Sequence, residues 1–71
     1  MDMENKNTVQ YFASNRDRKT VTILSGFTCW EHVQACFRMG FIMPDGHMAN
    51  GIGRNPDVAK AAAKSGYTIL N

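Results

Sequence analysis

The residues best suited to chemistry in this sequence are two cysteines and a histidine in one segment: Cys29, His32 and Cys36. On a helix these side chains fall within about 60° of arc, and a nearby loop could add His47 as a fourth ligand. Zinc accepts mixed cysteine and histidine ligands, but its sites usually include two cysteines separated by two residues, and this chain has no such pair. Cysteine is also often buried as a small apolar residue. We therefore predict packed cysteines, no metal and no cofactor.

The same segment also suits nucleophilic catalysis. Cys29 at a helix start, with His32 one turn later as the base, has part of the arrangement that a thiol enzyme needs. The neighbours Trp30, Val33 and Phe37 predict burial of the thiols instead. A chain this short also rarely builds a substrate pocket, and on one helix the two cysteines lie about 10 Å apart, too far for a disulfide. We predict reduced, unreactive thiols and a protein that is not an enzyme.

A second candidate for chemistry is segment 51–54, with the sequence Gly-Ile-Gly-Arg. Asn55 suits an N-cap and Pro56 a first helical position, so the sequence predicts a helix over 56–65 that ends at Gly66. A flexible glycine loop with an arginine, followed by free backbone N–H groups, can receive a phosphate or a carboxylate. The same residues equally describe a helix with a loose loop before it, and the sequence does not choose between them.

Residues 51–63 resemble the last segment of double-stranded-RNA-binding domains, where a G-x-G loop leads into an alanine-rich helix whose first lysines touch phosphates. That resemblance implies a nucleic-acid-binding face, which would consist of Arg54, Lys60 and Lys64. Proline and aspartate at positions 56 and 57 replace the paired lysines of that family, and the family begins and ends with helices. Nucleic acid is therefore our second choice of partner.

Two further features favour a protein partner. Segment 16–19, Arg-Asp-Arg-Lys, places three cations within four residues on an expected turn, which can attract an acidic surface. Apolar residues gather around a second turn, and the chain contains five methionines. Methionine suits adaptable contact surfaces, and an exposed apolar patch usually marks an interface. The predicted partner-binding residues are Arg16, Arg18, Lys19, Phe41, Ile42, Met43 and Met48.

Alternating apolar and polar residues predict the strands that position these groups. Segments 8–13 and 19–24 alternate and are joined by a polar turn, which predicts a β-hairpin. Segment 67–70 alternates in the same way and predicts a closing strand. Segment 41–49 contains a strong turn signal, and it fits a short hairpin and an irregular apolar loop equally well.

The best-specified element is a helix over 29–39. Thr28 and Glu31 predict a capping box at its start, and Gly40 ends it. Its apolar stripe consists of Cys29, Trp30, Val33, Cys36 and Phe37. The second helix has only a thin apolar face, consisting of Val58, Ala61 and Ala62. The order β-β-α-(loop or short hairpin)-α-β predicts a small two-layer α+β domain, with an antiparallel sheet and both helices on one face.

Composition limits the remaining choices. With 71 residues the chain has room for one domain, which we place at 8–71 after a flexible tail at 1–7. Its net charge of +2 is weaker than that of a dedicated nucleic-acid binder. The polar N-terminus is unlike a signal peptide, and no apolar run could span a membrane. We predict a cytoplasmic protein without membrane contact. A core this small also favours assembly with a partner or a second copy.

These observations predict a small, non-enzymatic protein-interaction module. Such chains are typical of phage and mobile-element accessory proteins that bind host machinery and inhibit it by occlusion. This comparison is based on the size and fold of the chain and not on particular residues. The expected partner is a protein with an acidic surface or a nucleic-acid-handling complex, and a homo-oligomer is also open. The alternative is a nucleic-acid-binding module that uses the G-x-G loop and the basic face of the second helix.

Overall fold

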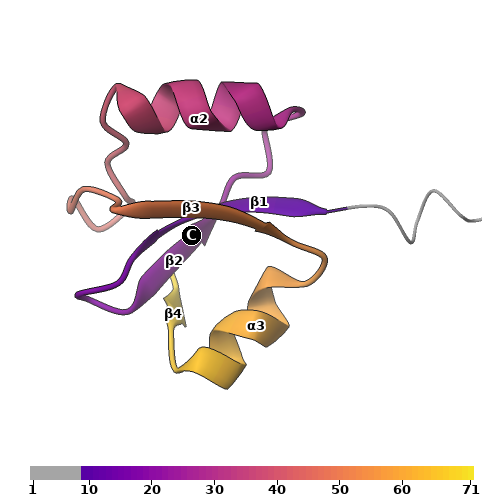
Figure 1. The fold of residues 1–71 in the computed structure, drawn as a ribbon. Helices are drawn as coiled ribbons and strands as arrows, with labels where there is room; N and C mark the ends of the chain where they lie inside the picture. The colour runs from indigo at the N-terminus through magenta and orange to yellow at the C-terminus, as the bar shows by residue number, and fades with distance from the viewer. Residues whose placement is uncertain (1–8) are drawn as a thin grey trace, which may run out of the picture.

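A computed structural model describes residues 9–71, which form a four-stranded sheet with a helix on each side (Figure 1). The predicted tail at 1–7 lies outside the described residues. In chain order the elements are β1 (Gln10–Asn15), β2 (Thr20–Ile23), α2 (Trp30–Arg38), β3 (Gly51–Asn55), α3 (Val58–Ser65) and β4 (Thr68–Ile69). The α+β class and the predicted order of elements are therefore confirmed. Neither helix of residues 9–71 has the length and apolar character needed to cross a bilayer.

The sheet has the strand order β3-β1-β2-β4 and is mixed. Strand β1 pairs antiparallel with β2, as the hairpin pattern predicts, and also antiparallel with β3. Strand β4 pairs parallel with β2, so the prediction of an antiparallel sheet is wrong at this edge. The reason is the crossover: helix α3 carries the chain back past the sheet, so β4 runs in the same direction as β3 and β2.

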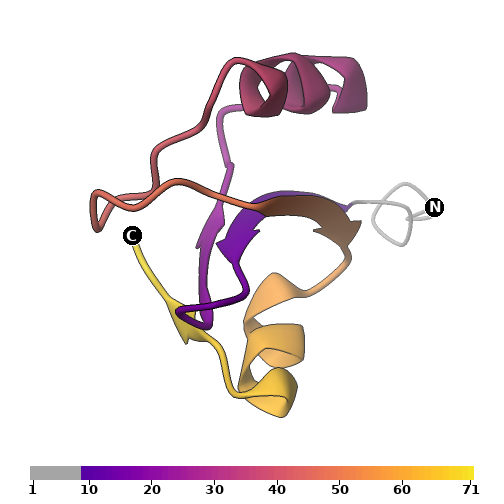
Figure 2. The same ribbon diagram turned by 60° about the vertical axis from the view of Figure 1, so that its left-hand side comes forward.

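The two helices lie on opposite faces of the sheet, not on one face as predicted (Figures 1 and 2). Side chains alternate between faces along a strand. Ala13 and Tyr11 of β1 belong to the apolar cluster under α2, whereas Phe12 between them packs in the cluster of Val58 and Ala62 under α3. Each face therefore needs its own cover, and each receives one helix.

The core under α2 is filled from the helix and from the loop that follows it. Trp30, Val33 and Phe37 are spaced by three and four residues, so they share the side of α2 that faces the sheet. The loop adds Met43, which with Val33 is the largest fully buried side chain of the described residues. The predicted stripe is thus correct for its bulky members.

Helix α2 begins one residue later than predicted. Its N-cap is Cys29, and no side chain caps the helix there, so the predicted capping box of Thr28 and Glu31 is wrong. With Cys29 as the N-cap, Glu31 is the second helical residue, one position short of where a capping box needs it. The helix ends at Arg38, and Gly40 follows with a left-handed φ of 95°, as its position predicts.

Helix α3 begins two residues later than predicted. Asp57, not Asn55, is the N-cap, and its carboxylate accepts a hydrogen bond of 3.1 Å from the backbone N–H of Lys60. Asn55 instead accepts from the backbone N–H of Asp57 at 2.8 Å, which closes a turn before the helix. Gly66 ends the helix with a φ of 77°, as predicted.

Segment 41–49 is a minimal hairpin. Ile42 and Met48 form a single antiparallel bridge, and Ala49 N–H donates to the Phe41 carbonyl at 2.8 Å. Inside the bridge, Met43 N–H donates to the His47 carbonyl at 2.7 Å. Of the two alternatives that the sequence left open, the structure selects the short hairpin.

Candidate protein-interaction site

The tip of the β1–β2 hairpin and the 41–49 hairpin are joined by one buried side chain, Asn15, which is 8% exposed. Its amide nitrogen Nδ2 donates to the Met48 carbonyl at 2.8 Å, and its Oδ1 accepts from the backbone N–H of Arg18 at 3.0 Å. Because one amide bonds to both segments, it fixes the basic tip relative to the apolar hairpin. The two features that the sequence predicted separately therefore lie at one site.

A second asparagine, Asn50, reinforces this junction from the surface. Its Oδ1 accepts from the backbone N–H of Arg16 at 3.0 Å, and its own backbone N–H donates to the Ser14 carbonyl at 2.9 Å. Arg18 Nε also lies 3.6 Å from Asp45 Oδ2, with side chains that are 51% and 24% exposed. An exposed ion pair adds only about 0–1 kcal/mol, so the neutral hydrogen bonds are the main constraint on the backbone.

The apolar surface of the described residues is concentrated at the same place. Four large apolar side chains are exposed in residues 9–71, and three of them, Met39, Ile42 and Met48, lie at or next to the 41–49 hairpin. Met48 lies over the end of α2, because a Cβ built on Gly40 would be 3.7 Å from its terminal methyl group. We call Arg16, Arg18, Met39, Ile42 and Met48 the tip–loop surface.

Three residues predicted for this site do not contribute to that surface. Met43 is 2% exposed and belongs to the core, so its assignment as a partner-binding residue is wrong. Alternation explains this, since Ile42 points outward in its bridge and the next side chain must point inward. Phe41 is half-buried against the same core. Lys19 is exposed but extends toward Tyr67, with Nζ 5.9 Å from the ring centroid.

The residues of the alternative nucleic-acid site are not brought together. Arg54 stacks on Trp30, with Cζ 4.6 Å from the ring centroid, so its side chain lies on the α2 face. Lys60 and Lys64 belong to α3, which covers the opposite face (Figure 2). Arg54 therefore lies on one side of the sheet and the helix that carries the two lysines on the other.

The G-x-G segment is a strand and not a flexible loop. Gly53 lies in β3 opposite Phe12, whose ring crosses it so closely that a Cβ on Gly53 would be 2.5 Å from Cζ. At the start of α3, Val58 N–H donates to the Gln10 side chain at 2.8 Å, and Lys60 N–H donates to the N-cap Asp57. Two backbone groups that an anion would need are thus already bonded, and the glycine serves packing.

The cysteines differ from the prediction of two buried thiols. Both are free, but Cys29 is exposed because it is the N-cap of α2, and Cys36 is half-buried. His32 lies beside Phe27, edge-on with ring centroids 6.5 Å apart. Within residues 9–71 no three histidine, cysteine, aspartate or glutamate side chains lie close enough to hold a metal ion.

Sequence reasoning missed Asn15, Asn50 and Met39. Both asparagines adjoin turns, where this residue type often bonds to nearby backbone, and that signal could have found them. Met39 comes after the apolar stripe of α2, at the helix end, where a side chain is expected to be exposed.

No protein-family model, curated protein or solved structure matches this chain. The functional assignment therefore depends on the geometry described above.

Proposed function

We propose that this protein is a small, non-enzymatic module that binds another protein through the tip–loop surface. The observation that carries the proposal is the gathering of three of the four exposed large apolar side chains of residues 9–71 beside a basic hairpin tip. Apolar side chains at the centre with polar groups around them are the usual anatomy of an interface. The module carries out no reaction in this proposal and acts on its partner by covering part of the partner's surface.

The bonds that fix this surface support the proposal. A loop that is ordered only on binding loses conformational entropy at that moment, which weakens the complex. Here Asn15 and Asn50 already hold both segments in place through five hydrogen bonds in which their backbone or side-chain groups take part. The apolar side chains are thus presented on a prearranged backbone.

The chemistry of the surface indicates what the partner should offer. Met39, Ile42 and Met48 need an apolar recess, and the flexible methionines can adapt to its shape. Arg16 makes no ion pair within the described residues, whereas Arg18 is paired with Asp45. We therefore expect one acidic group on the partner near Arg16 and a mainly apolar contact elsewhere.

The test compares surface variants by capture from the source cell and then with the purified partner. Ile42→Ser with Met48→Ser removes apolar contact, and Arg16→Glu reverses the charge of Arg16. The matched control is Lys60→Glu with Lys64→Glu, which changes two charges on α3, away from the surface. We expect the first two variants to lose the partner and the control to keep it, with all three retaining the thermal unfolding midpoint of the wild type within a few degrees.

Salt and nuclease distinguish the alternative partner. Binding to phosphates weakens steeply with salt because counterions are released, whereas an apolar protein contact changes little. If only the Lys60 and Lys64 variant loses binding, and that binding is salt-dependent and removed by nuclease, the protein is a nucleic-acid binder and our proposal is wrong. If the sole species bound is a second copy of this chain, sedimentation of the same variants will show self-association through this surface.

A further inference from the structure

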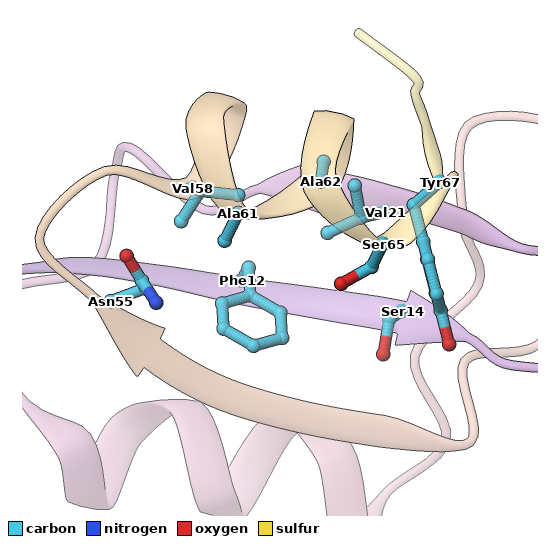
Figure 3. A pocket seen from close by; sticks show the side chains of 9 residues that line it. All are labelled: Phe12, Ser14, Val21, Asn55, Val58, Ala61, Ala62, Ser65 and Tyr67. Atoms are coloured by element: carbon cyan, nitrogen blue, oxygen red, sulfur yellow. The ribbon is translucent and has the colours of Figure 1, made fainter.

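A pocket of about 240 Å³ lies between α3 and the face of the sheet that α3 covers (Figure 3). Its floor is formed by Phe12 of β1 and Val21 of β2, and Val58, Ala61 and Ala62 of α3 form its opposite wall. Ser65 on its rim is exposed, so the pocket can be reached from solvent. It lies on a different face from the apolar residues of the tip–loop surface.

The pocket exists because both of its sides carry small residues. Strand β3 presents two glycines to this face: a Cβ on Gly51 would be 3.2 Å from Ser14 Oγ, and one on Gly53 would overlap the Phe12 ring. Helix α3 presents alanines, which extend only one methyl group toward the sheet. No described side chain fills the space left between them, whereas under α2 the buried Met43 packs in the cluster that includes Ala13 and Val33.

The lining is mainly apolar, with polar groups at its two ends. Hydroxyl groups of Ser14, Ser65 and Tyr67 lie at one end, and the Asn55 amide lies at the other (Figure 3). Within residues 9–71 none of these three hydroxyls takes part in a hydrogen bond, so a ligand can use them as donors or acceptors. No charged side chain is among the described residues that line the pocket, which favours a neutral ligand.

Size and shape restrict the ligand further. A dry cavity of about 150 Å³ lined by apolar side chains is enough to bind benzene, whereas pockets for drug-sized ligands start at about 300 Å³. The observed volume lies between these limits and suits one or two rings. The Phe12 ring on the floor offers an aromatic surface, against which another ring packs well in an offset or edge-on arrangement.

We propose that this pocket is a binding site for a small neutral aromatic molecule that carries a hydroxyl or a ring N–H group, as phenols and indoles do. The ring fills the space beside Phe12 and the alanines, and its polar group bonds to the hydroxyls of Ser65 and Tyr67. The site is independent of the proposed partner-binding function, because it shares no residue with the tip–loop surface.

The first experiment is an NMR titration of the ¹⁵N-labelled protein with phenol and with indole. We expect saturable shifts at Phe12, Val21, Ala61 and Ala62, with a dissociation constant on the order of 1 mM for so small a ligand. Toluene lacks the polar group and should bind about three- to tenfold more weakly, which corresponds to one hydrogen bond. Benzoate is charged and should not bind. Shifts that do not saturate, or equal affinity for toluene and phenol, would overturn the proposal.

Variants in α3 provide the second experiment. Ala61→Leu fills the pocket and should weaken phenol binding at least about tenfold, since the space that the ring needs is lost. Ala63→Leu makes the same change at an exposed position of the same helix and should bind phenol as the wild type does. Ser65→Ala should weaken phenol but not toluene. If Ala61→Leu and Ala63→Leu bind phenol equally, the ligand lies elsewhere and the inference is wrong.

Ser65→Ala keeps the test decisive should Ala61→Leu disturb the fold, because Ser65 is exposed and serine and alanine differ by a single oxygen. Loss of phenol affinity in Ser65→Ala, with toluene affinity unchanged, supports the hydroxyl contact. Unchanged affinity for both ligands contradicts it. Neither result depends on partner capture, so this inference and the proposed function can fail separately.

Discussion

The two faces of the sheet are covered in different ways. On the α2 face, a helix of nine residues and the 41–49 hairpin together supply aromatic and methionine side chains, and Met43 and Val33 are fully buried. On the α3 face, a helix of eight residues supplies mainly alanines, and a pocket of about 240 Å³ remains. The α2 face is thus filled at its centre, with a second pocket of about 200 Å³ beside Tyr11, Leu24 and Phe27, whereas the α3 face is open between its helix and the sheet.

This difference indicates how stability is divided between the two faces. In a closely packed interior, removal of a large side chain lowers the free energy of unfolding. We therefore expect substitutions on the α2 face to destabilise the protein most. A face covered by alanines gains less from burial, since hydrophobic stabilisation follows the apolar area removed from water. The α3 face can therefore keep an open recess at small cost, and the two faces should respond differently to substitution.

The largest expected effect is on the filled face. Met43→Ala should lower the free energy of unfolding by about 2–5 kcal/mol, because it leaves a cavity in the core. In a domain of this size that corresponds to a fall of about 10 °C or more in the unfolding midpoint. The matched control is Met48→Ala in the same hairpin, where the side chain is 55% exposed and the change should stay within about 0.5 kcal/mol. Equal effects of the two substitutions in thermal unfolding would show that the loop does not fill the core.

An intermediate effect is expected on the open face, at Gly53. Gly53→Ala places a methyl group on the Phe12 ring, at 2.5 Å from Cζ before any shift, so the ring must move into the pocket. Overpacking of this kind costs about 1–3 kcal/mol. Gly26→Ala is the control, because a Cβ there meets nothing within 4 Å, and its stability should be unchanged or slightly higher. Urea denaturation of both variants measures the difference; equal stability would mean that Gly53 is not required by packing.

Patterns confined to one element were predictable from the sequence. Alternation at 8–13 and 19–24 gave the hairpin, and Gly40 and Gly66 ended the helices as expected. Helix starts were less accurate, because α2 starts without a side-chain cap and α3 offers two candidate caps, Asn55 and Asp57. At α3 the Gln10 side chain bonds to Val58 N–H, which favours a start after Asp57.

Features that depend on distant segments could not be predicted. The face that each helix covers follows from two crossovers, β2-α2-β3 and β3-α3-β4, which run across the sheet in opposite directions and which no local pattern contains. Met43 and Met48 look alike in the sequence, and only the register of the Ile42 bridge sends one inward and the other outward. The role of Gly53 depends on Phe12, which lies on the neighbouring strand.

The smallest expected effect compares how the two helices begin. Helix α3 buries few large side chains and starts with a side-chain cap, so Asp57→Ala should cost about 1 kcal/mol, or a fall of about 4–8 °C in the unfolding midpoint. Helix α2 has no side-chain cap and is held by the packing of Trp30, Val33 and Phe37. Thr28→Ala should therefore change stability by no more than about 0.5 kcal/mol.

Asp57→Asn is the control for the α3 cap, because its side-chain oxygen can still accept the Lys60 N–H, and it should keep most of the stability that Asp57→Ala loses. Thermal unfolding of the three variants side by side decides the matter. A loss in Thr28→Ala as large as that in Asp57→Ala would mean that a capping box forms at the start of α2. The filled face would then depend on a local cap as the open face does, and the contrast between the two helices would not hold.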